Sequence, residues 1–289
     1  MASAKDLRKR IQSVKNTQQI TKAMKMVSAA KLRRAQNNIL ALRPYAHEVS
    51  SVITGLVRAG SELSHPLLTP RDQPEVQNIL TVLVTSDRGL CGAFNGNVIK
   101  AGQRLLRTEA GKYKKYDFAF IGKKGYEFFK LRKPGKYHLG FFTGLTFEKS
   151  SGLSRELIEL YLSGEYDEIR FIYNEFKSAI LQKMTMETLL PIRAQEGTPV
   201  AETALTIYEP TAPEILDALL PKHFAVQVHK MLLESLAGEH GARMAAMENA
   251  TKNANEMIRK ITLLYNKTRQ AGITKELLEI ISGTEAAKG

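Results

Sequence analysis

Apolar residues recur at helical spacing over both ends of the chain. From Lys5 to about Leu56 there is no glycine before Gly55, and the one proline is Pro44. Alternating steps of four and three from Leu7 to Leu56 visit fifteen positions, of which eleven are apolar when alanine is counted. This is the spacing of a coiled-coil seam. We therefore predict one helix of about 50 residues, roughly 80 Å long, that Pro44 kinks at most.

The seam of this predicted helix has one polar interruption. Four consecutive seam positions are polar, and they are Gln18, Thr21, Lys25 and Ser28. Over the same stretch, apolar residues move to a neighbouring stripe, formed by Ile20, Met24 and Val27. The interruption distinguishes these two to three turns from the rest of the helix.

A second long helix is predicted from about Ala212 to Ala287. The same four–three steps run from Leu236 to Ala271 along an alanine-rich seam, through Met247, Ala250, Ala254, Met257, Ile261 and Leu264. Neither helix could bury its stripe alone, and no third segment is comparable in length. We expect the two to form an antiparallel coiled coil. Two separate long helices on a globular body are the alternative.

Between these helices, short β-rich runs alternate with helical segments. Strands are predicted at residues 79–85, 117–121, 137–142, 168–173 and about 184–190, with helices at 97–109, 125–131 and 153–162. Such alternation is typical of a mostly parallel sheet covered by helices, and the fifth strand should lie at an edge. The predicted fold class is α/β: a coiled coil of the N- and C-terminal helices plus a Rossmann-like domain with a five-stranded sheet. The expected segments are 1–58, 75–195 and 209–289.

Charge and composition limit the classes of partner. The formal net charge is +13, and residues 1–43 hold eleven Lys or Arg against one acid, a net +10. An element this basic favours an acidic partner, which could be nucleic acid, anionic lipid or an acidic protein surface. Cys91 is the one cysteine, so no internal disulfide can form. No signal peptide is predicted, and no apolar run approaches the roughly 18 residues of a membrane span, so membrane attachment should come through partners.

The segment with the most chemical interest is residues 86–95, SDRGLCGAFN, between the first strand and a helix. A glycine-bearing turn at this point can hold a phosphate on backbone N–H groups. It lacks the lysine–hydroxyl pair of a P-loop, however, and its glycines do not have dinucleotide-binding spacing. A tight turn that brings strand and helix together is favoured. Cys91 is a nucleophile candidate, but a buried structural thiol is favoured because no histidine lies nearby in the sequence.

No other cluster indicates catalysis. The six histidines show no tight metal-ligand spacing, although His223 and His229 share a helix. The carboxylates Asp167 and Glu168 are predicted to form a solvated turn at the start of a strand. The sequence thus predicts no catalytic, cofactor-binding or metal-binding residue.

Runs at both ends and in the middle resemble the signature segments of F-type ATP synthase γ subunits. They are residues 10–16 (RIQSVKN), 19–27 (QITKAMKMV), 29–31 (AAK), 86–92 (SDRGLCG), 244–254 (MAAMENATKNA), 265–271 (YNKTRQA) and 273–279 (ITKELLE). The resemblance covers essentially the whole chain in the expected order. Thr284 stands where the family usually has alanine, and the regulatory cysteine pair of the chloroplast form is absent.

The resemblance implies a rotor shaft rather than an enzyme. In such complexes the coiled coil lies inside a ring of three α and three β subunits, and the α/β domain sits with ε against the membrane c-ring. Proton flow turns the ring and γ with it, and γ drives the β sites through different nucleotide affinities. The implied location is peripheral, on the cytoplasmic face of a bacterial cell membrane. The polar stretch Gln18 to Ser28 is then expected to face the surrounding ring.

The resemblance also implies contact residues. Lys22, Met24 and Lys25 should lie near an acidic loop of β. An upper contact with β is expected from Arg269, Gln270, Thr274 and Glu276. Contact with the c-ring is expected from Tyr208 and Glu209. Without the resemblance, each of these would be read as an ordinary solvated position.

A basic coiled-coil nucleic-acid-binding protein is the alternative function. It would explain the basic N-terminal helix, but aromatic residues are missing there and no nucleic-acid-binding fold is recognisable. A nucleotide-dependent enzyme with a coiled-coil arm would need a phosphate motif that the sequence lacks. Co-purification with two larger nucleotide-binding subunits, three copies of each per chain, would separate the shaft from both.

Overall fold

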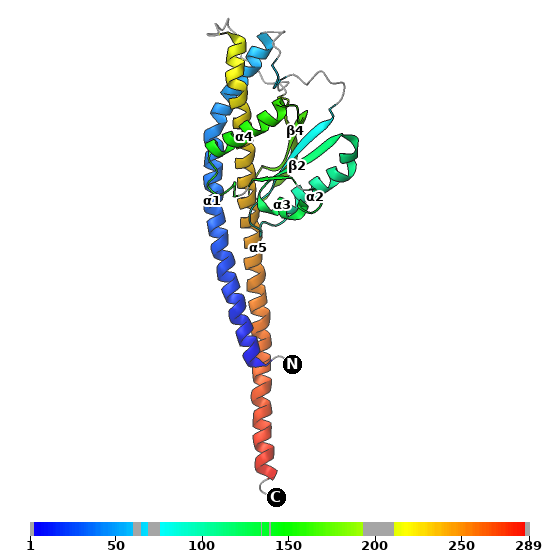
Figure 1. Ribbon diagram of the computed structural model, residues 1–289. Coiled ribbons are helices and arrows are strands. Elements are labelled where there is room, and N and C mark those ends of the chain that lie inside the picture. The colour runs from blue at the N-terminus through cyan, green and yellow to red at the C-terminus, as the bar shows by residue number, and fades with distance from the viewer. Residues whose placement is uncertain are drawn as a thin grey trace. The chain divides into compact units, whose positions relative to one another are not determined.

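The computed structural model describes residues 3–59, 65–68, 76–133, 135–138, 140–192 and 211–286. Its main elements are α1 (Ala4–Ala59), β1 (Asn78–Val84), α2 (Phe94–Thr108), β2 (Lys115–Ile121), α3 (Lys123–Phe129), β3 (Lys136–His138), α4 (Phe147–Leu162), β4 (Glu168–Phe176), β5 (Gln182–Leu190) and α5 (Ala212–Ala286), as Figure 1 shows. A short 3₁₀ turn, Ala110–Lys112, follows α2. The two long helices predicted at the ends of the chain are confirmed, and each runs through a proline, Pro44 in α1 and Pro221 in α5.

The chain divides into two compact units. One contains Met1–Ser28 and Met244–Gly289, and we call it the two-helix unit. The other contains Ala29–Arg243, and we call it the α/β unit. Helices α1 and α5 each contribute residues to both.

The sheet of the α/β unit has the order β3-β2-β1-β4-β5. Strands β1 to β4 are parallel, and β5 pairs antiparallel with β4 at one edge. The predicted five-stranded, mostly parallel sheet is confirmed. The largest differences from the predicted boundaries are at the end of β3 and the start of α4. Strand β3 ends at His138 because Gly140 and Gly144 adopt positive φ in the turns that follow. Helix α4 begins at Phe147, where the Thr146 hydroxyl accepts a hydrogen bond from the N–H of Lys149.

Helices cover both faces of this sheet, which explains its continuous apolar strands. From β1, Ile79 and Leu83 belong to a core cluster with residues of α2 and α3, such as Val98 and Phe129. The alternate residues of β1 belong to a second cluster with residues of α1, α4 and α5, and these are Leu80, Val82 and Val84. The alternation of side chains along a strand therefore distributes one apolar run between two cores.

Candidate functional site

In the two-helix unit, α1 and α5 pair antiparallel through polar side chains. Gln18 Nε2 donates to Asn255 Oδ1, and the hydroxyls of Thr21 and Thr251 share a hydrogen bond of 2.8 Å. One turn further along α1, Lys25 Nζ forms an ion pair with Glu248. Along these pairs the residue numbers rise on α1 and fall on α5, so the two helices run antiparallel.

The predicted outward position of the polar stretch is therefore wrong. Thr21 and Ser28 are 9% and 3% exposed, and both belong to the buried stripe of α1. The apolar side chains Ile20, Met26 and Val27 point away from the seam, with more than half of each exposed. The four–three spacing holds through the interruption, and three of its polar residues, Gln18, Thr21 and Lys25, pair with polar side chains on α5.

Beyond Ala254, the seam of α5 matches the predicted one at Ile261 and Thr268 and differs from it at the positions between them. The buried or half-buried positions there are Ile258, Ile261, Thr262, Tyr265 and Thr268. Met257 and Leu264, which the prediction placed on the seam, are 46% and 51% exposed. Sequence spacing could not separate the two phases because adjacent positions, 257 with 258 and 264 with 265, are both apolar or aromatic.

Helix α5 continues past the first residues of α1 (Figure 1). The observed pairing places Ala4, the first residue of α1, level with about residue 269 of α5. Every residue from 271 to 284 is exposed. This segment, which we call the tip, carries large apolar side chains, and they are Ile273, Leu277, Leu278, Ile280 and Ile281. A single helix with so much exposed apolar surface is typical of an interaction site.

The predicted β-contact residues lie on two surfaces of the two-helix unit. Lys22 is exposed, whereas Met24 and Lys25 are half-buried beside the seam. At the start of the tip all four predicted residues are exposed, and they are Arg269, Gln270, Thr274 and Glu276. The Thr274 hydroxyl donates to the Gln270 carbonyl at 3.0 Å. The predicted c-ring residues Tyr208 and Glu209 lie outside the described residues.

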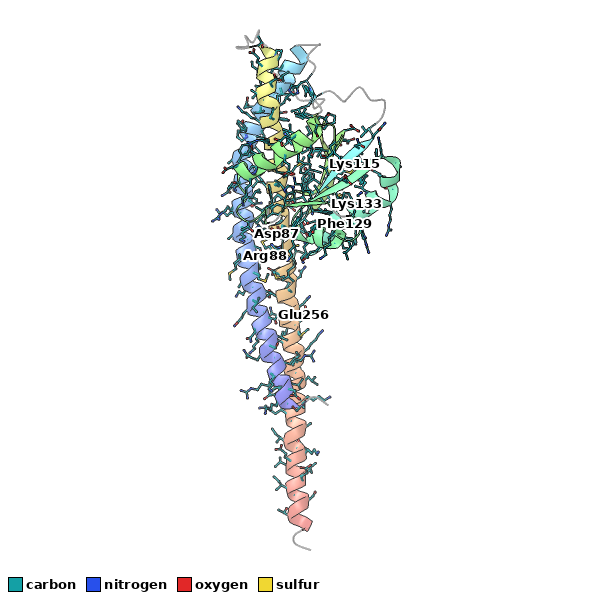
Figure 2. All side chains as sticks on the ribbon, viewed as in Figure 1. Asp87, Arg88, Lys115, Phe129, Lys133 and Glu256 are labelled. Carbon is teal, nitrogen blue, oxygen red and sulfur yellow. The ribbon has the colours of Figure 1, made fainter. Side chains whose placement is uncertain are left out.

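The turn between β1 and α2 is closed by its own polar groups. Asn95 Oδ1 accepts from the Ser86 N–H at 2.9 Å, and Asn95 Nδ2 donates to Ser86 Oγ and to Cys91 Sγ. The Asp87 carboxylate accepts from the N–H of Lys123 at the start of α3. Figure 2 labels Asp87 and Arg88 in this turn. These bonds support the favoured reading of a tight structural turn over a phosphate cradle.

Arg243 of α5 binds the same turn, a contact that no sequence motif indicates. Its Nε and Nη2 donate to the Gly89 carbonyl at 3.2 and 3.1 Å, and Nη2 also reaches the Arg88 carbonyl at 3.3 Å. Nη2 is 2.7 Å from Glu239 Oε1 in an ion pair whose two side chains are each 8% exposed. The guanidinium thus joins α5 to a turn more than 150 residues away in sequence.

Burial controls the protonation of this cluster. It raises the pKa of Glu239, an effect that the positive charge of Arg243 opposes. It lowers the pKa of His240 to about 4, so this imidazole is neutral near pH 7. Burial also raises the pKa of the Cys91 thiol. A buried, protonated thiol whose hydrogen-bond partners are Ser86, Arg88 and Asn95 is a poor nucleophile, as the structural reading expects.

The remaining candidate residues, His223, His229 and Asp167, are buried in the fold. His229 shares a 2.8 Å hydrogen bond with Ser150, and burial lowers the pKa of His223. Within the described ranges, no group of three or more His, Cys, Asp or Glu side chains could hold a metal ion. The expected solvated turn at Asp167 is wrong. This carboxylate is 9% exposed and accepts from the N–H groups of Gln77 and Asn78, because it caps the start of β1.

In the part of the chain that the structure describes, no helix combines the length and the hydropathy that crossing a bilayer requires.

Comparisons with known sequences give matches over the full length. A family model described as ATP synthase matches residues 3–287. A protein of Geobacter sp. (strain M21), named ATP synthase gamma chain, is 51% identical over 290 residues, and all of both chains is covered. A protein of the same name from Bdellovibrio bacteriovorus is 50% identical over 298 residues, again with full coverage of both.

Solved structures with a similar fold come from rotary assemblies. A chain of the Euglena gracilis mitochondrial ATP synthase, in a structure titled OSCP/F1/c-ring, matches with a TM-score of 0.64 and 21% identity, covering 98% of this chain and 94% of that one. A chain of the Tetrahymena thermophila mitochondrial ATP synthase central stalk and c-ring matches with a TM-score of 0.60 and 24% identity, covering 80% and 99%. At these identities the likeness concerns the fold.

Proposed function

Because the chain belongs to the ATP synthase gamma chain family, we propose that it is the central rotor shaft of a rotary F-type ATP synthase, with no catalytic site of its own. The observation that carries this proposal is the two-helix unit. Three polar residues of its seam pair across the two helices, while its outer face presents basic side chains and exposed apolar ones, Ile20, Met26 and Val27. Such a surface is typical of a protein that binds partners and not of a catalytic site.

The partners proposed are three α and three β subunits, an ε subunit and a membrane c-ring. The chain then lies peripherally on the cytoplasmic face of a bacterial cell membrane. Rotation of the c-ring, driven by proton flow, turns the chain, whose asymmetric surface changes the nucleotide affinity of each β site in turn. Physically, a rigid element couples two sets of binding equilibria. The nucleic-acid alternative has no comparable support.

Two surfaces are proposed to contact β. The first is formed by Lys22, Met24 and Lys25, beside exposed apolar side chains that can bind an apolar rim of an acidic loop. The second lies at the start of the tip, where four exposed side chains can form hydrogen bonds and ion pairs, and they are Arg269, Gln270, Thr274 and Glu276. Because Lys25 is already paired with Glu248, an acidic partner would have to compete for it, whereas Lys22 is exposed.

The proposed function is tested by assembly. Co-expressed with α and β subunits, the chain is expected to purify at one copy per three of each, and the assembly should hydrolyse ATP. The chain alone should show no turnover, since it presents no phosphate-binding loop with a catalytic base. Measured release of phosphate distinguishes the two samples. Robust hydrolysis by the chain free of α and β would contradict the proposal.

The proposed c-ring contact is tested by replacing both Tyr208 and Glu209 with alanine. An aromatic ring next to a carboxylate can anchor a small interface, with the ring giving area and the acid giving orientation. Detached α–β–γ assemblies carrying the change are expected to hydrolyse ATP at the unmodified rate. Membranes carrying it should show reduced ATP-driven proton pumping, or release the complex more readily at low salt. If hydrolysis in the detached assembly is abolished instead, these residues do not contact the c-ring.

A further inference from the structure

Three successive cross-helix pairs of the two-helix unit are polar, although α1 carries apolar residues on the adjacent stripe. The pairs are Gln18 with Asn255, Thr21 with Thr251, and Lys25 with Glu248. On α1 the neighbouring apolar side chains Ile20 and Val27 are 59% and 56% exposed. The seam is therefore polar because polar residues of α1 face α5, while apolar residues lie on the adjacent stripe.

A polar seam costs stability relative to an apolar one, and its best-supported use in coiled coils is to specify register. We propose that these three pairs fix the axial register of α1 against α5. The rest of the seam specifies the axial register poorly. It contains small residues such as Ala250 and Ala254, and apolar ones such as Ile11 and Ile261. Apolar neighbours can exchange one partner for another at little cost in free energy.

The alternative registers show how the pairs discriminate. If α5 slipped by seven residues in one direction, Gln18 would lie opposite Thr262, Thr21 opposite Ile258 and Lys25 opposite Asn255. That slip removes the ion pair and replaces the hydrogen bond between threonines by a contact with a hydrocarbon. A slip in the other direction would set Thr21 opposite Met244. Each slip thus loses matched polar contacts, which is an effective way to exclude a competing structure.

The register sets how far the tip extends beyond α1. A seven-residue slip would move the tip by about 10 Å along the helix axis, at about 1.5 Å per residue. Under the proposed function, this displacement would take Arg269, Gln270, Thr274 and Glu276 away from their contact with β. The register itself is a property of this chain and is measured without partners, so its test and the assembly test can fail separately.

The test uses the full-length chain with spin labels on the two helices. Labels at Lys9→Cys and Lys252→Cys occupy exposed positions, and Cys91→Ala is present in every sample. In the observed register the labels are offset by about 18 Å along the axis, and a seven-residue slip changes this offset by about 10 Å. Pulsed electron paramagnetic resonance measures the distance distribution.

Two variants are compared with the unmodified seam. The apolar-seam variant carries Gln18→Leu, Thr21→Val, Lys25→Leu, Glu248→Leu, Thr251→Val and Asn255→Leu. The matched control makes the same kinds of change at exposed positions of the same helices, with Lys15→Leu, Thr17→Val, Gln19→Leu, Asn253→Leu and Glu256→Leu. Glu256 is labelled in Figure 2.

One distance population is expected for the unmodified seam and for the control. The apolar-seam variant should keep its helical circular dichroism and gain a second population displaced by about 10 Å. A single unchanged distance in the apolar-seam variant would overturn the proposal. So would the same second population in the control, or a loss of helical signal in the apolar-seam variant, because apolar substitution should not weaken a seam whose polar pairs serve register alone.

Discussion

Replacing Gly122 by alanine is expected to unfold the α/β unit, at a cost of more than about 4 kcal/mol. Gly122 follows β2 with φ +94°, a conformation that residues with a Cβ rarely adopt. A Cβ there would lie 1.9 Å from the carbonyl oxygen of Thr85 and 2.6 Å from its carbonyl carbon. Both neighbours are backbone atoms, so no side chain can rotate to relieve the overlap.

The backbone around Gly122 cannot shift without breaking the sheet. The Thr85 N–H donates to the Ile121 carbonyl at 2.8 Å, and the Thr85 hydroxyl accepts from the Gly125 N–H at 2.9 Å. These bonds hold the ends of β1 and β2 and the start of α3 together. A domain with a typical stability of about 5–15 kcal/mol would lose much or all of it.

The matched control is Gly96→Ala in α2. A Cβ at Gly96 meets no atom within 4 Å, and the residue lies inside a helix. Alanine is favoured over glycine there by about 1 kcal/mol, so this variant should be at least as stable as the parent. Urea unfolding followed by tyrosine fluorescence measures both. Equal urea midpoints for the Gly122 and Gly96 variants would show that the stability of the α/β unit does not depend on the close approach of β1 and β2.

The sequence predicted the elements well where one physical rule governed them. The seam of α1 followed the four–three spacing because every seam position faces inward, whether polar or apolar. The predicted outward position of Gln18 to Ser28 is wrong because polar residues can be buried where polar partners lie opposite them. In fact Thr21 is buried because a hydroxyl partner, Thr251, lies opposite it. Only knowledge of the other helix could reveal that pairing.

Other features depend on contacts between distant segments. The phase of α5 could not be chosen between Met257 and Ile258, since both are apolar and burial follows the position of α1. The four–three steps from Leu236 pass through His240 and Arg243, so they place Arg243 on the predicted seam of α5. In the structure, Arg243 instead binds the carbonyls of Arg88 and Gly89. A backbone carbonyl has no sequence signature, so its use as a partner is invisible before the fold is known.

Replacing Arg243 by methionine is expected to destabilise the α/β unit by about 3–5 kcal/mol, the usual result of leaving one partner of a buried ion pair uncompensated. Glu239 would then be a buried carboxylate without its cation, and the carbonyls of Arg88 and Gly89 would lose their donors. Hydrogen exchange at residues 86–95 and urea unfolding measure the loss. Arg259→Met, at an exposed arginine of the same helix, is the control and should change little.

Two further measurements distinguish the two causes of this loss, which are the uncompensated charge of Glu239 and the missing donors to the turn carbonyls. Adding Glu239→Gln to Arg243→Met removes the uncompensated charge, so the double variant should be more stable than Arg243→Met alone.

The loss of stability in Arg243→Met should also depend on pH. Arg243 lowers the pKa of Glu239, so removing it raises that pKa further above the unfolded value of 4.5. A carboxyl with a raised folded pKa stabilises the fold below the unfolded pKa, and that contribution is lost as pH rises through the folded pKa. The difference between parent and Arg243→Met should therefore be smallest at and below pH 4.5 and should grow as the pH rises above it. If it is the same at every pH and Glu239→Gln restores nothing, the charge of Glu239 is not what makes Arg243 necessary, and the bonds to the turn carbonyls alone must account for the loss.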